Sequence, residues 1–575
     1  MGRNAAIVGI SGLILVAMVV VAVTVGVPYH LNTIHRQDKD SAQLKTSTKA
    51  IKEICQPTDY KENCIKSLSS VAGNRTSDPN ELIKLAFKVA IDRVKKASKE
   101  SELLNKATKD PRTSKALQNC KELMSYAIED LSSALKRFEN FDLSEINELV
   151  DDLKIWLSAS MTYQETCLDG FEGAEGGTAK KMKKALQGAS ELTRNALAII
   201  NEISSFLSSL DLPNARPRRL LSETSMDMDM ESFPSWVSYG RRRLLASPIT
   251  LTVKPNVVVA KDGTGKFTTI NAALATFPKK SNETFVIYIK EGVYQEEVII
   301  ERNMQNVMMI GDGPTKTKIT GNKNFVDGTP TFKTATVAVM GDGFIAKNIG
   351  FENSAGPEKE QAVALRVQAD RSIFYNCQMD GYQDTLFAQT ARQFYRDCTI
   401  TGTIDFIFGN AAAIFQNCKM LVRKPMKGQQ NIVTAQGRMD RREPTAIIIQ
   451  NCTISADPEY YPLRNTIPTY LGRPWKERSR TFIYMSKIDD LIHRDGWLPW
   501  DGEFALNTCF YSELNNRGEG SSIAHRVKWK GIKSITMKHA QKFSVENFIK
   551  GNSWIKASGV PFTAGLLPAS HKQQN

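Results

Sequence analysis

The distribution of apolar residues divides the chain into two parts of different texture. From about residue 40 to residue 210, apolar side chains recur every three or four positions, as at Leu82, Leu85, Ala86 and Val89. This interval places them along one face of an α-helix. Four or more such segments, separated by polar breaks, predict a helical bundle in which those faces pack together.

From about residue 250 onward the helical interval disappears and short β-rich runs alternate with Gly and Asn. A six-residue pattern (apolar, polar, Asn or Asp, Cys, polar, apolar) surrounds Cys377, Cys398, Cys418 and Cys452. The first three of these cysteines are 21 and 20 residues apart. A repeat of that length without helices predicts a solenoid. The expected fold is an N-terminal all-α four-helix bundle followed by a C-terminal all-β right-handed parallel β-helix.

The segment between these two parts is rich in proline, serine and charge, which is typical of a linker. It contains the motif Arg-Arg-Leu-Leu twice, at residues 218–221 and 242–245. A basic motif repeated between two domains indicates proteolytic processing. The predicted organisation is an N-terminal stub, apolar segment and stalk (1–40), the bundle (41–210), the linker (211–247) and the β-helix domain (248–575).

The N-terminal apolar segment predicts the route that the chain takes. Residues 5–27 form an uncharged run of 23 residues behind Arg3, long enough to cross a bilayer. We read the run as a secretory signal or an uncleaved signal anchor, with the rest of the chain lumenal or extracellular. Glycosylation sequons at Asn74, Asn282 and Asn451 agree with that route.

The nine cysteines become disulfide candidates in a secretory protein. Cys55 and Cys64 bracket a short loop, whereas Cys120 and Cys167 lie on separate helical segments. The pairs Cys55–Cys64 and Cys120–Cys167 would use all four cysteines of the bundle.

The chain is basic, with 75 Lys and Arg against 61 Asp and Glu and a net charge of +14. Such a balance favours an anionic partner: nucleic acid, an anionic membrane or an acidic polysaccharide. The secretory route argues against nucleic acid. We expect membrane contact only through the N-terminal segment.

Two aspartates occupy corresponding places in the repeat. Asp384 and Asp405 each follow a pattern cysteine by seven residues. Adjacent parallel strands lie about 4.8 Å apart, so the carboxylates are predicted to lie within roughly 5–6 Å of each other. Two such carboxyls separate in proton affinity, leaving one as nucleophile or base and the other as acid. The alternative interpretation is that the two aspartates lie on a solvated surface and have no catalytic role, because the same spacing is expected there.

Two glutamines extend this pattern. Gln361 to Gln383 and Gln383 to Asp405 are both intervals of 22 residues, which predicts one stripe across three coils. A carboxylate pair also suits a retaining glycosidase, but amide donors stabilise the oxyanion of ester cleavage. The set therefore favours acyl chemistry. The sequence has no G-x-S-x-G nucleophile motif and no histidine spacing for zinc, so we expect neither a metal nor a cofactor.

Five ordered motifs now carry a resemblance to a known family: GVYQE (292–296), QAVAL (361–365), GYQDTLF (381–387), GTIDFIFG (402–409) and YLGRPW (470–475). With them the chain resembles the plant pectin methylesterases that carry an inhibitor-like pro-region. The resemblance implies hydrolysis of methyl esters in homogalacturonan, with release of methanol, in the extracellular cell wall. The bundle resembles the pectin methylesterase and invertase inhibitors. The Arg-Arg-Leu-Leu motifs resemble the family's processing signal, which implies a subtilase-type protease as partner.

The resemblance also implies roles for individual residues. Asp405 would be the nucleophile and Asp384 the acid and then the base, while Gln361 and Gln383 would hold the oxyanion. Arg473 would orient Asp405 and contact substrate. Thr331 and Trp475 would also bind substrate.

A disulfide between Cys398 and Cys418 is implied as well, although spacing alone equally allows Cys377 with Cys398. Either pairing leaves at least one of the five cysteines after residue 250 unpaired. Glu360 and Glu519 depart from the family, where histidine and proline are frequent, and neither is a motif residue.

Two other readings of the chain stay open. It could be another β-helix pectinase, a polygalacturonase or a lyase, or an inhibitor and wall-binding protein without esterase activity. The expected partners of the catalytic part also include its own pro-region and separate inhibitor proteins.

Overall fold

The computed structural model describes residues 47–72, 76–141, 145–174, 176–209, 254–278 and 283–566. The predicted membrane segment, the linker with both Arg-Arg-Leu-Leu motifs, Asn74 and Asn282 lie outside these ranges. Within them, no helix combines the length and apolar character needed to cross a membrane.

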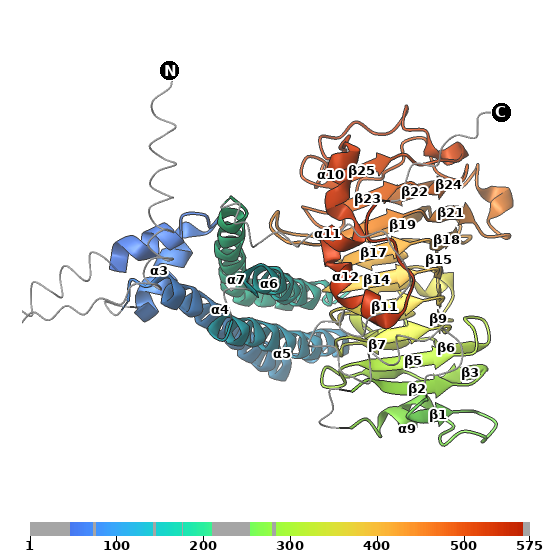
Figure 1. Cartoon of the computed structure of the whole chain (residues 1–575), viewed down its shortest axis with the longest axis horizontal. Coiled ribbons are helices and arrows are strands. Elements are labelled where there is room, and N and C mark those ends of the chain that lie inside the picture. The colour runs from blue at the N-terminus through green and yellow to red at the C-terminus, as the bar shows by residue number, and fades with distance from the viewer. Residues whose placement is uncertain are drawn as a thin grey trace, which may run out of the picture.

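The N-terminal part is helical, as the apolar spacing predicted. Its helices are α3 (Lys61–Ala72), α4 (Pro79–Ala107), α5 (Pro111–Glu139), α6 (Ile146–Asp169) and α7 (Thr178–Ser209). Asp78 and Asp110 cap α4 and α5 by accepting backbone N–H groups, each directly before a proline at the first helical position. The four long helices, α4 to α7, form the bundle and extend away from one flank of the β-helix (Figure 1).

Both disulfides predicted for the helical part are formed. Cys55 is bonded to Cys64 and Cys120 to Cys167, and all four cysteines are buried. The second bond joins α5 to α6.

The C-terminal part winds into three parallel sheets, and successive strands of one coil go to different sheets. The first sheet contains β1 (Val257–Val259), β2 (Phe285–Ile289), β5 (Val307–Gly311), β8 (Ile345–Lys347), β11 (Ser372–Tyr375), β14 (Arg392–Arg396), β17 (Ala412–Gln416), β20 (Ala446–Gln450), β23 (Arg480–Tyr484) and β25 (Phe510–Leu514). The second contains β4 (Val298–Ile300), β7 (Val337–Val339), β10 (Leu365–Val367), β13 (Leu386–Ala388), β16 (Ile407–Gly409), β19 (Asn431–Gln436) and β22 (Thr469–Gly472). The third contains β3 (Gly292–Gln295), β6 (Thr317–Gly321), β9 (Gly350–Asn353), β12 (Gln378–Asp380), β15 (Thr399–Gly402), β18 (Lys419–Val422), β21 (Thr453–Ala456) and β24 (Lys487–Ile488). The predicted fold class, a helical bundle followed by a parallel β-helix, is confirmed.

Short helices complete the β-helix domain. The segment α9 (Ile270–Leu274) lies near its first strands, and α10 (Met537–Ala540), α11 (Val545–Ile549) and α12 (Gly551–Trp554) follow its last strand. Val545 and Ile549 of α11 pack against outward-facing apolar residues of the first sheet, among them Phe394 and Phe482. This contact covers one face of the solenoid.

A ladder of asparagines turns the chain between the first and third sheets. Asn376, Asn417 and Asn451 all adopt left-handed backbone conformations, with φ between 50° and 59°, which Asn tolerates better than most residues. Asn451 Nδ2 donates to Asn417 Oδ1 at 2.8 Å. The nitrogen that would carry a glycan at Asn451 is thus already hydrogen-bonded within the ladder.

The predicted Cys398–Cys418 disulfide is wrong. Both cysteines are buried free thiols, as are Cys377, Cys452 and Cys509. The reason lies in the stacking of the coils: Thr399 pairs with Lys419 in register, so the cysteines just before them project into the core side by side. Parallel strands in register direct these two side chains the same way, so the thiols lie beside each other without pointing at each other.

Candidate active site

The two aspartates singled out from the sequence occupy equivalent positions on adjacent coils. Leu386 of β13 pairs with Ile407 of β16, and each follows its aspartate by two residues. Asp384 and Asp405 both have left-handed backbones, with φ of 64° and 51°. Aspartate tolerates that conformation better than most residues, and it recurs at other turns of the coils, as in the asparagine ladder. Only 7% of Asp384 and 4% of Asp405 is exposed to solvent.

Arg473, which directly follows β22, holds Asp405 in place. Its Nε donates to Asp405 Oδ1 at 2.9 Å and its Nη2 donates to Oδ2 at 2.6 Å. The guanidinium also lies over the ring of Trp500, 4.2 Å from the ring centroid. This bidentate geometry fixes the orientation of the carboxylate and favours its ionised form.

The surroundings of the two carboxyls affect their pKa values differently. Burial raises the pKa of Asp384 well above its ordinary value, and the negative charge of Asp405 raises it further. Burial also raises the pKa of Asp405, but Arg473 opposes that effect through its charge and hydrogen bonds. Of the two groups, Asp384 therefore keeps its proton to higher pH than Asp405 does.

A cavity of about 560 Å³ opens over this pair. All seven site residues predicted from the sequence line it: Thr331, Gln361, Gln383, Asp384, Asp405, Arg473 and Trp475. Sequence reasoning missed its aromatic lining by Phe387, Phe408 and Trp500. Phe387 and Phe408 stack with centroids 4.3 Å apart, and the centroid of Trp475 lies 5.8 Å from that of Phe408. Each Phe follows its aspartate by three residues, and that repeated spacing was the signal available for them.

Both glutamines line the cavity, but they do not form the predicted stripe of equivalent positions. Leu365, Leu386 and Ile407 are paired in register, so one coil here takes 21 residues rather than 22. Gln361 precedes its strand by four residues and Gln383 precedes its strand by three. They are not strict equivalents of Asp405, but both line the same cavity. Gln361 Oε1 is buried and lacks a hydrogen-bond partner among the described residues.

The helical bundle supplies the opposite wall of the cavity. The end of α6 and the turn after it contribute Thr166, Leu168, Asp169, Gly170, Phe171 and Glu172, and Ala179 comes from α7. Gln361 Nε2 donates to Glu172 Oε2 at 3.4 Å, and the charge of Glu172 helps to raise the pKa of Asp384. The bundle therefore places a carboxylate beside one of the predicted oxyanion donors.

Ion pairs join the bundle to the β-helix around this cavity. Lys476 Nζ donates to Glu165 Oε1 at 2.8 Å and to Asp169 Oδ1 at 2.7 Å. Similar pairs are Lys333 with Glu122 (2.6 Å), Arg392 with Asp152 (2.6 Å) and Arg302 with Asp130. In each of these pairs the cation belongs to the β-helix and the carboxylate to the bundle.

Comparison with known proteins assigns both parts of the chain. The family described as pectinesterase matches residues 256–552, and the plant invertase/pectin methylesterase inhibitor family matches residues 49–199. The probable pectinesterase/pectinesterase inhibitor 21 of Arabidopsis thaliana is 49% identical over 566 residues, 98% of this chain and 83% of that protein. Pectinesterase 3 of Citrus sinensis is 43% identical over 525 residues, 90% of this chain and 88% of its own length.

A solved structure gives the same assignment for the β-helix. The pectin methylesterase from carrot is 50% identical and covers 55% of this chain and all of its own length, with a TM-score of 0.55. Fold and site thus define a carboxylic ester hydrolase of the pectinesterase class. The chain belongs to the plant pectinesterase/pectinesterase inhibitor family, with an N-terminal inhibitor domain and a C-terminal pectinesterase domain. The prediction of a pectinesterase, rather than a polygalacturonase or a lyase, is confirmed.

Proposed function

We propose that the β-helix domain removes methyl groups from galacturonate esters of homogalacturonan through a covalent acyl-enzyme. The observation that carries this mechanism is the bidentate contact of Arg473 with Asp405 beside the more basic carboxyl of Asp384. One carboxyl is thereby ready to attack and the other to donate a proton.

In the first half of the reaction, an oxygen of Asp405 forms a bond to the ester carbonyl carbon. The carbonyl oxygen becomes an oxyanion, which the side-chain amides of Gln361 and Gln383 stabilise. The bond to the methoxy oxygen then breaks, and Asp384 gives its proton to that oxygen, so methanol leaves. The product of this step is an anhydride between Asp405 and the galacturonate.

In the second half, Asp384 is a carboxylate and accepts a proton from water. The water oxygen bonds to the same carbonyl carbon, and the bond from that carbon to Asp405 breaks. Asp405 returns as a carboxylate held by Arg473, and the polymer carries a free carboxyl. The same residue serves as acid and then as base because the first step removes its proton.

The rest of the cavity suits a sugar polymer that becomes anionic. Phe387, Phe408 and Trp475 offer aromatic surface for pyranose rings, and Thr331 offers a hydroxyl at the edge. Lys333 and Lys476 supply positive charge nearby. These contacts support partly methyl-esterified homogalacturonan as the substrate.

We further infer that the N-terminal domain inhibits the catalytic domain within the same chain. Glu172 and Phe171 line the cavity that substrate would need, and Glu172 accepts a hydrogen bond from Gln361. Activation would then require cleavage in residues 211–247 by a subtilase-type protease. This order of events fits a protein that is exported to the cell wall before it acts.

The decisive test is the Asp405→Asn variant of the processed protein, assayed for methanol release from methyl-esterified pectin. We expect the rate to fall by at least about a thousandfold because the nucleophile is gone. Unchanged circular dichroism and thermal unfolding would establish that the variant folds. Methanol release at the parent rate would remove this site from the reaction and favour a binding role.

A further inference from the structure

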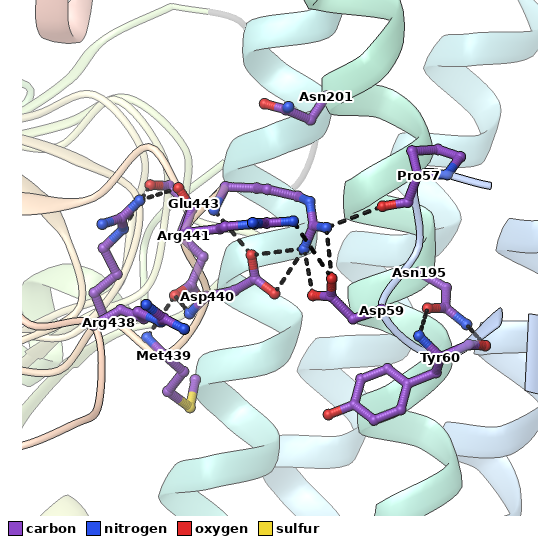
Figure 2. Close-up of polar contacts among 12 residues, drawn as sticks. Pro57, Asp59, Tyr60, Asn195, Asn201, Arg438, Met439, Asp440, Arg441 and Glu443 are labelled. Atoms are coloured by element: carbon purple, nitrogen blue, oxygen red, sulfur yellow. Dashed lines mark hydrogen bonds and ion pairs between the residues drawn. The ribbon is translucent and has the colours of Figure 1, made fainter. Parts of the chain in front are cut away.

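The bundle touches the β-helix at a further place, apart from the residues that line the catalytic cavity and from the ion pairs described above. The loop closed by the Cys55–Cys64 disulfide meets the turn 438–443, which connects β19 to β20. Figure 2 shows Pro57 and Asp59 of the loop facing the turn that carries Asp440. Arg442 donates from Nη1 to Asp59 Oδ2 at 2.7 Å and from Nη2 to Asp59 Oδ1 at 2.9 Å. It also donates to the Pro57 carbonyl at 3.0 Å.

The turn holds Arg442 in position through contacts of its own. Glu443 accepts the backbone N–H groups of Met439 and Asp440 at 2.7 and 2.9 Å. Asp440 in turn accepts the backbone N–H of Arg442 at 2.9 Å and contacts its guanidinium at 3.3 Å. Only 8% of Arg442 is exposed. These partners belong to the β-helix domain and position Arg442 in part, and the shorter contacts of its guanidinium come from Asp59 and Pro57 of the disulfide loop.

The loop is equally well supported from the bundle side. The disulfide closes it, and Thr58 Oγ1 donates to the Cys55 carbonyl at 2.7 Å. Asn195 of α7 accepts the Tyr60 N–H at 3.2 Å and donates to the Tyr60 carbonyl at 3.0 Å (Figure 2). Asp59 is thus presented by a segment fixed to the bundle. Two surfaces that are already ordered lose little conformational entropy when they meet.

We propose that Asp59 and Arg442 form a second docking site that keeps the inhibitor domain on the catalytic domain after the linker is cut. This inference rests on the inhibition proposed above. Contacts at separate places on one rigid domain reinforce one another, because each raises the effective concentration of the others. Cleavage by itself therefore leaves the catalytic cavity covered, and activity appears only when the cut inhibitor domain dissociates.

The experiment uses the full chain with a site-specific protease sequence placed within residues 211–247. The protein is cut under native conditions and diluted in steps. At each step, gel filtration measures the bound fraction of the inhibitor domain, and a methanol assay measures activity. The variant is Asp59→Asn, and the matched control is Glu62→Gln, a charge removal at an exposed position in the first turn of α3, within the same disulfide-closed segment.

We expect the parent and the Glu62→Gln control to dissociate over the same concentration range. Asp59→Asn should dissociate at a concentration about tenfold higher, a modest effect because Asp59 is half-exposed. In the double variant Asp59→Asn with Arg442→Gln, the second change should add little, because the pair is already broken.

Retention of Asp59→Asn as tight as that of the parent would overturn the second docking site. The two measurements also distinguish the docking site from the proposed inhibition on which it rests. If the cut protein stays associated but hydrolyses pectin at full rate, inhibition fails and the docking site stands. If Asp59→Asn leaves association unchanged while the parent complex is inactive, inhibition stands and the docking site fails.

Discussion

Arg473 donates hydrogen bonds to both carboxylate oxygens of Asp405. Asp384 lies one coil away with a left-handed backbone like that of Asp405, and burial raises its pKa well above the ordinary value. The coils thus place two chemically identical side chains in matched geometry, and their surroundings raise the pKa of Asp384 further than that of Asp405. Only one of the two is held by a bidentate guanidinium. The proposed division into a nucleophile and an acid rests on that asymmetry.

Replacing Arg473 by Lys tests the asymmetry directly. Lysine keeps the positive charge but loses the planar pair of donors that fixes the carboxylate. We expect kcat of the processed enzyme to fall about 100-fold, because a misaligned nucleophile loses near-attack geometry. Rates of methanol release over a range of pectin concentrations give kcat and KM. An effect confined to KM would mean that Arg473 binds substrate without orienting Asp405.

The pH profile should follow from the two carboxyls. Asp405 must be ionised to attack, so activity is lost as pH falls through its pKa, which is itself raised by burial. Asp384 must be protonated to release methanol, so activity is lost again as pH rises through its higher pKa. We expect a bell-shaped dependence of kcat/KM, with the acid limb displaced above the range of an ordinary aspartate. An Arg473→Lys profile with an unmoved acid limb would contradict this assignment.

The buried carboxyl of Asp384 should also lower the free energy of unfolding at neutral pH. A carboxyl whose pKa is higher in the folded state binds more protons there than in the unfolded chain, so the free energy of unfolding decreases as pH rises from about 4 through the folded pKa. Asp384→Asn removes this titration and should raise the free energy of unfolding at pH 7 by on the order of 1 kcal/mol. Chemical denaturation of the processed protein at pH 4 and pH 7 measures it. The gain should shrink at pH 4, and an equal gain at both values would point to packing instead.

Much of the site could be predicted because the coil repeats. Asp384 and Asp405 follow their cysteines by the same interval, and they are true equivalents in the register of β13 and β16. The glutamines converge on the cavity although their 22-residue spacing does not match the 21-residue coil. Their approach depends on the irregular segments before the strands, and such segments have no period in sequence.

Other features of the molecule depend on contacts that no spacing records. The role of Glu172 as part of the cavity wall requires the bundle to dock on the β-helix, far from it in sequence. Trp500 reaches Arg473 from a loop outside the five motifs. The disulfide implied between Cys398 and Cys418 is absent, although the spacing correctly places the two cysteines on adjacent coils. The parallel strands direct both thiols the same way, and the spacing does not reveal that direction.

Glycine at position 437 should determine how Trp475 is seated in the cavity. A Cβ atom added there would lie 2.9 Å from Cε3 of Trp475, so the indole must move. Overpacking of this kind typically costs about 1–3 kcal/mol of stability. We expect Gly437→Ala to raise KM severalfold with a smaller change in kcat, because Asp384 and Asp405 stay in place.

Removing the carboxylate of Glu172 should weaken inhibition in the uncut chain without dissolving the docked interface. Glu172→Gln keeps the size of the side chain but removes the charge that faces Gln361 and helps to raise the pKa of Asp384. Lys476 keeps both of its bundle carboxylates, Glu165 and Asp169, so the domains should remain together.

We expect methanol release by the uncut Glu172→Gln variant to rise severalfold over that of the uncut parent. The processed forms, which lack this residue, should have identical rates. Glu62→Gln, which changes an exposed carboxylate of the same domain, is the matched control. Equal activity of the Glu172→Gln and Glu62→Gln chains would mean that the bundle blocks the cavity by its bulk and not through this carboxylate.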